Sequence, residues 1–436
     1  MNRGLNRLGA ARIAEGIAGG DFTAEAVMRD CLDRVDHRDK EVGAFTVVDA
    51  DAAMTAARNA DTQTDRGPLH GVPFAIKDII DTVSLPTGWG SRIYDGHRPP
   101  RNASCVELLI QAGAIPLGKT VTTEFAYFQP GGTANPHNLA HTPGGSSSGS
   151  AASVADFMAP LAFGSQTAAS LIRPASFCGI LGYKPTLGAF DLQGVMGLAP
   201  SLDTLGLMAR EVDDFVLARS ALCGSPLAGL PAFEDNAPRI ALMRGPHWRE
   251  GSVEMRDICQ TALAGLADAG AQTGELTHPE IFEELTDCQN TVMAFETARA
   301  RIFEYRNHRS LISDTFAALV ETGLATTRVR YDAARQAAAL AGRMLETLFT
   351  DIDVILAPAA PGEAPKGLTA TGDPLFSRAW TLLQVPCLSI PFGTGPNRLP
   401  LSFQVIGRHG ADDRLLAAAK WIERHLGQGT SPLRPQ

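Results

Sequence analysis

Residues 142–186 have the sequence TPGGSSSGSAASVADFMAPLAFGSQTAASLIRPASFCGILGYKPT, in which two loops of small residues flank one apolar segment. A serine-glycine loop runs from Pro143 to Ser150, an apolar segment from Ala151 to Phe163, and a second loop of small residues from Gly164 to Ser170. Small side chains let a substrate approach the backbone and leave its N–H groups free to point at an anion. Because hydroxyls cluster in both loops, we expect a nucleophile beside oxyanion donors.

A flexible linker rich in serine and glycine is the plain alternative for such loops. Linkers are not bounded closely by apolar segments, whereas here the core pattern continues past the second loop through Phe177, Cys178, Ile180 and Leu181. The sequence therefore favours two tight loops held by one buried core.

The stretch resembles the signature of the amidase signature family of serine hydrolases. Gly144-Gly145-Ser146-Ser147 match the first block of that signature, and Ser170 falls on the position of the nucleophile. The matching tail consists of Phe177-Cys178-Gly179 and Lys184-Pro185-Thr186. A match of this length is far more specific than a lone G-x-S-x-G.

Strands separated by helical stretches predict an α/β fold. The resemblance implies one large domain over residues 1–436, with a mixed, mainly parallel central sheet covered by helices on both faces. Its tightly matching core spans about 67–210, and a variable helical region at about 225–345 is expected to shape the substrate pocket.

The composition limits the partners of the chain. It has 436 residues, 44% of them hydrophobic, and a formal net charge of −9, which disfavours binding to nucleic acid or to an anionic membrane. Seven scattered cysteines without a C-x-x-C pair give no support to a zinc or redox motif. Met1 to Ala18 lacks the apolar region of a signal peptide, so we expect a cytoplasmic protein.

Lys77 ends a strand-like segment in which Val72, Phe74 and Ile76 alternate with other residues. Taken alone, a lysine there is usually a solvated edge charge or a partner of Asp78. The segment from Gly67 to Asp78 resembles a family run whose lysine is the catalytic base.

The resemblance implies a Ser–Ser–Lys mechanism without metal or cofactor. Ser170 is the expected nucleophile, Ser146 the bridge and Lys77 the base. Burial must lower the pKa of Lys77 from about 10.4 for it to act as a base. The peptide bond before Ser146 is expected to be cis. The backbone N–H groups of Thr167, Ala168, Ala169 and Ser170 are expected to form the oxyanion hole.

The chain departs from the family pattern at three places. Gln166 stands where an aspartate is usual, Ala168 and Ala169 replace two glycines, and Arg173 comes one position late. Alanine tolerates positive φ poorly, so these changes put rate and substrate in question more than reaction type. The segment with Thr123, Glu124, Phe125 and Tyr127 resembles a stretch beside the family's active site and is expected to bind substrate.

A competing motif occurs between Gly113 and Thr120, where G-x-x-x-x-G-K-T matches a phosphate-binding loop. Such a loop needs its glycines between a strand and a helix, and here the first glycine precedes the strand. The motif therefore gives little support to nucleotide binding.

Three functions fit these observations. The first is an amidase that hydrolyses a carbon–nitrogen bond of a small amide, with carbamates, ureas or esters open to the same acyl-enzyme. The second is the amidase-like subunit of a tRNA-dependent amidotransferase, against which the acidic chain and Gln166 argue. The third is a silent binding protein, which the complete triad disfavours. The oligomeric state stays open, a homodimer included.

Overall fold

The computed structural model describes residues 4–224, 233 and 237–426. The strands are β1 (Phe45–Val48), β2 (Pro73–Lys77), β3 (Ile115–Thr120), β4 (Leu161–Gln166), β5 (Leu181–Lys184), β6 (Thr204–Ala209), β7 (Arg239–Met243), β8 (Gln272–Leu276), β9 (Val354–Pro358), β10 (Cys387–Thr394) and β11 (Pro400–Gly407). The α-helices are α1 (Ala10–Gly19), α2 (Ala24–Val42), α3 (Ala50–Thr62), α4 (Ser104–Gln111), α5 (Ser148–Ala155), α6 (Ile172–Phe177), α7 (Val212–Cys223), α8 (Val253–Asp268), α9 (Leu285–Ala300), α10 (Ile302–Asn307), α11 (Asp314–Ala325), α12 (Arg328–Leu348), α13 (Leu375–Leu382) and α14 (Asp412–Leu426). Short 3₁₀ helices cover Leu5–Arg7, Arg92–Tyr94, Glu124–Ala126, Trp248–Glu250, Glu280–Glu284 and Arg309–Leu311.

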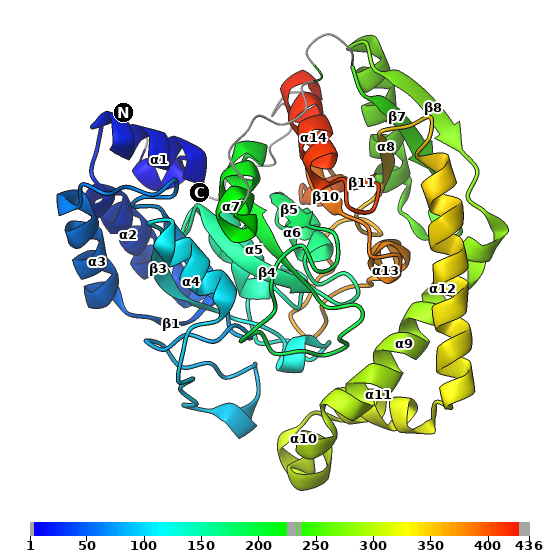
Figure 1. Ribbon diagram of the computed structural model, residues 1–436, viewed down its shortest axis with the longest axis horizontal. Coiled ribbons are helices and arrows are strands. Elements are labelled where there is room, and N and C mark those ends of the chain that lie inside the picture. Colours follow the sequence, from blue (N-terminus) through cyan, green and yellow to red (C-terminus); the bar gives the residue numbers. More distant parts are fainter. Residues whose placement is uncertain (1–3, 225–232, 234–236, 427–436) are drawn as a thin grey trace.

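The described residues form one 11-stranded sheet in the order β1-β3-β2-β4-β6-β5-β10-β11-β9-β7-β8. Every residue of β4 and β6 is buried, so both faces of the sheet are covered at its centre. Figure 1 shows α1 to α4 around the β1–β3 end of the sheet and α8 beside the β7–β8 end. The predicted single α/β domain with a large mixed sheet flanked by helices is confirmed.

The parallel share of the sheet is smaller than predicted, because six of its ten strand pairs in the described residues are antiparallel. A parallel pair needs a crossover connection, which α4 supplies between β2 and β3 and α8 between β7 and β8. The short link between β10 and β11 instead permits an antiparallel hairpin.

The apolar segment predicted at Ala151–Phe163 is two elements. Helix α5 ends at Ala155, Phe157 has a positive φ of 59°, and β4 begins at Leu161. Pro160 lacks a backbone N–H and follows this break, so the chain enters the sheet instead of extending the helix. The two loops of small residues therefore lie at the start of α5 and at the end of β4.

The competing phosphate-binding motif is part of the sheet. Gly118, Lys119 and Thr120 all lie within β3, not in a loop between a strand and a helix. This geometry does not form a phosphate-binding loop. Within the described ranges, no helix combines the length and apolar character that a bilayer crossing requires.

Candidate active site

The sheet brings the lysine and the second small-residue loop to one edge. Strands β2 and β4 are parallel neighbours, with Phe74 opposite Leu161 and Ala75 opposite Ala162. Because parallel strands end at the same edge of a sheet, Lys77 at the end of β2 lies beside the loop that follows Gln166. Strand pairing thus joins two motifs that are far apart in the sequence.

Lys77 is fully buried, and its Nζ donates to Ser146 Oγ and to Ser165 Oγ, each at 2.7 Å. Both partners are neutral hydroxyls. Burial lowers the pKa of Lys77 well below its usual 10.5, and the nearby Asp203 carboxylate opposes this shift. The site therefore favours a neutral amine, the form that can accept a proton.

Ser146 follows a cis peptide bond, Gly145–Ser146, as the resemblance implies. Its carbonyl oxygen accepts from the backbone N–H of Thr123 at 3.3 Å. Gly144 has a φ of 84°, and a Cβ at this position would lie 2.9 Å from Cα of Pro174. The loop can approach α6 this closely only because it has glycine there.

Ser170 is 8% exposed and lies against the start of α5, where the backbone N–H of Ser147 donates to its carbonyl oxygen at 3.2 Å. The preceding carbonyls are also engaged. Gln289 Nε2 donates to the Thr167 oxygen at 2.9 Å, and Thr381 Oγ1 donates to the Ala168 oxygen at 2.8 Å. In a planar trans peptide the N–H points opposite to the C=O. The N–H groups of Ala168 and Ala169 therefore point away from Gln289 and Thr381.

The alanines of this loop are not strained. Neither Ala168 nor Ala169 is among the described residues with positive φ. The expected conflict between alanine and a glycine conformation therefore does not arise at these two positions.

Gln166 accepts hydrogen bonds that an aspartate could also accept. Its Oε1 receives the backbone N–H groups of Leu171 at 3.1 Å and Ile172 at 3.0 Å, while its Nε2 donates to Thr381 Oγ1 at 2.9 Å. The carboxamide thus ties the start of α6 to α13. A carboxylate could accept the same two N–H groups but could not donate to Thr381.

Arg173 remains in the site despite its shifted position. Its Nη2 donates to the Gly145 carbonyl at 2.6 Å and to Thr371 Oγ1 at 3.1 Å, and its Nη1 donates to the Gly372 carbonyl at 2.6 Å. Burial lowers its pKa to about 9. These contacts hold the peptide before Ser146 in place.

The predicted substrate-binding segment divides into two roles. Thr123 lies beside the Ser146 loop, where a Cβ on Gly145 would lie 3.1 Å from its Cγ2. The carboxylate of Glu124 instead accepts from Ser313, through both the backbone N–H at 3.1 Å and the hydroxyl at 2.5 Å, and so binds the start of α11.

The aromatic residues of this segment also face α11. Phe125 packs on Phe316 with ring centroids 4.7 Å apart, and Tyr127 lies 6.3 Å from the same ring. Phe125 has a φ of 47° and Ala126 a φ of 58°, which places strained backbone next to the catalytic loops. Contact with substrate remains a prediction for all four residues of the segment.

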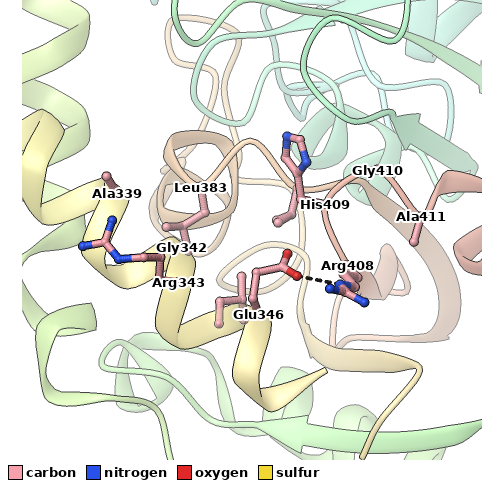
Figure 2. A pocket seen from close by; sticks show the side chains of 11 residues that line it. Ala339, Gly342, Arg343, Glu346, Leu383, Arg408, His409, Gly410 and Ala411 are labelled. Atoms are coloured by element: carbon pink, nitrogen blue, oxygen red, sulfur yellow. Dashed lines mark hydrogen bonds and ion pairs between the residues drawn. The ribbon is translucent and has the colours of Figure 1, made fainter. Parts of the chain in front are cut away.

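A pocket also lies away from these residues, between α12 and the turn from β11 to α14. It has a volume of about 580 Å³, and Arg343, Glu346, Arg408 and His409 line it (Figure 2). Glu346 accepts from Arg408 at 2.5 Å across this pocket. None of the three predicted catalytic residues lines it, so its size does not make it the active site.

Comparison with known proteins decides the family. The Amidase family model matches residues 26–416. The chain belongs to the amidase family. This confirms the resemblance found in the signature stretch, and the activity class follows as that of a hydrolase acting on carbon–nitrogen bonds.

Named relatives of this amidase-family chain include two amidotransferase subunits and one free enzyme. It is 32% identical to a glutamyl-tRNA(Gln) amidotransferase subunit from Anaeromyxobacter sp. (strain K), over 99% of both chains. It is also 32% identical to the corresponding subunit from Acidothermus cellulolyticus (strain ATCC 43068 / DSM 8971 / 11B), over 98% of this chain and 96% of that one. The solved peptide amidase from Stenotrophomonas maltophilia superposes with a TM-score of 0.83 at 25% identity, over 99% of this chain and 98% of that one.

Sequence reasoning missed Ser165, Gln289 and Thr381 as parts of the site. Ser165 was visible in the second loop and could have been found from its place in a strand parallel to β2. Gln289 and Thr381 lie on α9 and α13, where single polar residues in helical segments carry no local motif.

Proposed function

We propose that the chain hydrolyses an amide through a Ser170–Ser146–Lys77 triad and an acyl-enzyme. The observation that carries this proposal is the fully buried Lys77, which is hydrogen-bonded only to hydroxyls among the described residues and whose ammonium form burial disfavours. A lysine in these surroundings can act as a base near neutral pH.

In the proposed reaction, Ser170 Oγ attacks the amide carbonyl carbon while its proton passes to Ser146, and the Ser146 proton passes to Lys77 Nζ. The N–H groups of residues 167–170 stabilise the oxyanion. As the C–N bond breaks, the proton returns through Ser146 to the leaving amine. Water then attacks the ester of Ser170, which releases the acid and restores the serine.

For the substrate class we propose a small linear amide. The two curated relatives favour a more specific second candidate, the amidase-like subunit of a tRNA-dependent amidotransferase. Gln166 no longer disfavours that candidate strongly, because its carboxamide still accepts two backbone N–H groups at the start of α6.

One experiment separates these candidates. Ammonia release is measured on primary amides, primary carbamates and L-glutamine, and alcohol release on esters, for the wild type and for Ser170→Ala. A free amidase turns over several small amides alone. An amidotransferase subunit turns over glutamine and copurifies with partner subunits when expressed in its native host. A wild type that neither releases product nor reacts with a fluorophosphonate probe would contradict both.

A further inference from the structure

Arg378 is a buried cation beside the catalytic loops without a carboxylate partner. It lies on α13, is 9% exposed, and its Nη1 donates to Oε1 of Gln289, a neutral group. Within the described part of the chain, Arg378 forms no ion pair. A buried charge is costly without a partner, so this guanidinium calls for an anion.

The carboxylate whose charge acts on Arg378 belongs to an exposed residue, Asp373. Burial lowers the pKa of Arg378, and Tyr127 and Asp373 oppose that shift. Asp373 is exposed, and its Oδ1 accepts from the backbone N–H of Leu375 at 2.9 Å. It does not neutralise the guanidinium at close range.

Arg378 lies next to the loop that carries Ser170. Gln289, which accepts from Arg378, donates through its Nε2 to the Thr167 carbonyl at 2.9 Å. Thr381, one turn further along α13, donates to the Ala168 carbonyl at 2.8 Å. Two independent contacts therefore place this part of α13 against the proposed oxyanion loop.

The other cation near Arg378 already donates to neutral acceptors through both terminal nitrogens, although its Nε has no hydrogen-bond partner among the described residues. Arg173 donates to two carbonyl oxygens and one hydroxyl, so it serves the backbone around Ser146. Burial and the charge of Arg378 both lower the pKa of Arg173, since the two cations repel each other. Two adjacent buried cations make the surroundings of Arg378 attractive to an anion.

We propose that Arg378 binds a carboxylate of the substrate, so that the preferred substrate is an amide that also carries a carboxylate. The planar guanidinium matches a carboxylate with paired hydrogen bonds, which a lysine could not reproduce. This inference rests on the proposed amide hydrolysis and names the substrate class and the residue that selects it.

The test compares matched substrates. The kcat/KM for ammonia release is measured on malonamate, succinamate and glutaramate, and on neutral amides in which an isopropyl group replaces each carboxylate. The variants are Arg378→Met, Arg378→Lys, and Arg343→Met as a control that removes an exposed arginine from the pocket of Figure 2, which neither Arg378 nor the proposed triad lines.

We expect the wild type and Arg343→Met to prefer at least one carboxylate-bearing amide over its neutral partner. Arg378→Met should lower kcat/KM for that amide on the order of 100-fold, mainly through KM, with little change for the neutral partner. Arg378→Lys should restore part of the preference. An equal loss on both members of a pair would mean that Arg378 only supports Gln289 and Thr167, and would overturn the proposal.

A binding measurement keeps the proposal separate from the proposed reaction. Calorimetry with malonate, succinate and glutarate needs no turnover. The wild type should bind at least one of these dicarboxylates more tightly than Arg378→Met does, even if no amide in the panel is hydrolysed. If Arg378→Met does not fold, Arg378→Lys takes its place. Equal affinity in the wild type and the folded variant would overturn the proposal.

Discussion

Two buried lysines on neighbouring strands have opposite surroundings. Lys77 ends β2, and Lys119 lies in β3 opposite Ile76, one position before the partner of Lys77. Lys119 lies 3.2 Å from Asp78 and donates to the Ile80 carbonyl and to Thr87 Oγ1, each at 2.6 Å. Among the described residues, the Nζ of Lys77 hydrogen-bonds only to the hydroxyls of Ser146 and Ser165.

We propose that this difference separates a structural charge, Lys119, from a base, Lys77. Burial lowers the pKa of Lys119 to about 8, and Asp78 acts in the opposite direction through charge and hydrogen bonding. For Lys77 the fall in pKa is opposed only by Asp203, whose Oδ1 accepts from Thr167 and whose Oδ2 accepts from two backbone N–H groups. Burial alone does not make a lysine a base; the lack of a close carboxylate partner does.

The largest expected difference between the two lysines is in turnover. Lys77→Met should lower kcat for amides by roughly 10²–10⁴, because it removes the proton acceptor while Ser170 remains. Ester turnover should suffer less, since an alkoxide leaves with less need for protonation. Ammonia and alcohol release measure the two rates.

Lys119→Met is the matched control for this prediction. The amide turnover of this variant, per folded molecule, should stay near that of the wild type. The Nζ of Lys119 contacts Ile80, Thr87 and Asp78, none of which belongs to the proposed triad. A Lys77→Met enzyme that keeps near-wild-type amide turnover would remove Lys77 from the mechanism and leave His70 and Glu124 as bases to test.

The two substitutions should affect stability in the opposite order, because Lys119→Met should destabilise the fold more than Lys77→Met does. Lys119→Met leaves Asp78, whose side chain is 8% exposed, buried without its cation, which should cost about 3–5 kcal/mol of unfolding free energy. The double variant Lys119→Met/Asp78→Asn should recover much of this loss. Urea unfolding measures both values. A single variant as stable as the wild type would show that the pair is not a structural element.

Lys77→Met should leave the melting temperature unchanged or raise it at neutral pH. The pKa of Lys77 is lower in the folded chain, so the unfolded chain binds a proton that the folded chain does not. Its contribution to stability therefore rises with pH between the folded pKa and 10.5, and Lys77→Met should flatten that part of the curve. Thermal unfolding from pH 6 to pH 10 tests this, and a large loss of stability at pH 7 would contradict it.

The smallest effect concerns Ser165, which accepts from Lys77 without belonging to the triad. Ser165→Ala should lower kcat about tenfold with little change in KM, since the hydroxyl positions the amine and touches no substrate. Ser165→Thr keeps the hydroxyl and should restore most of the rate. Steady-state kinetics on one amide are sufficient, and a loss that appears in KM alone would assign Ser165 to substrate binding.

The proposed triad could be named from the sequence because each member lies in a stretch that resembles the family signature. Ser146 and Ser170 lie in loops of small residues, which indicate a nucleophile, whereas the alternating strand alone leaves Lys77 as an edge charge and only the family resemblance implies its role as the base. The same reasoning recognised the α/β fold, yet it overestimated the parallel share of the sheet, since the hairpin from β10 to β11 resembles any other pair of buried strands.

The supporting residues could not be predicted in the same way. Gln289 and Arg378 reach the catalytic loop from α9 and α13, and their roles depend on helix packing that no local spacing encodes. Glu124 has a second contact that its motif does not encode, because its carboxylate accepts from Ser313 at the entry to α11, while its contact with substrate stays a prediction.

The central claim is that Lys77 acts as a neutral base while Lys119 stays a structural charge. The most direct test is kcat/KM against pH for the wild type and Lys119→Met on one amide. Both profiles should rise with pH through the same apparent pKa, well below the 10.5 of a free lysine. A flat profile, or an apparent pKa that is lost in Lys119→Met, would contradict the assignment.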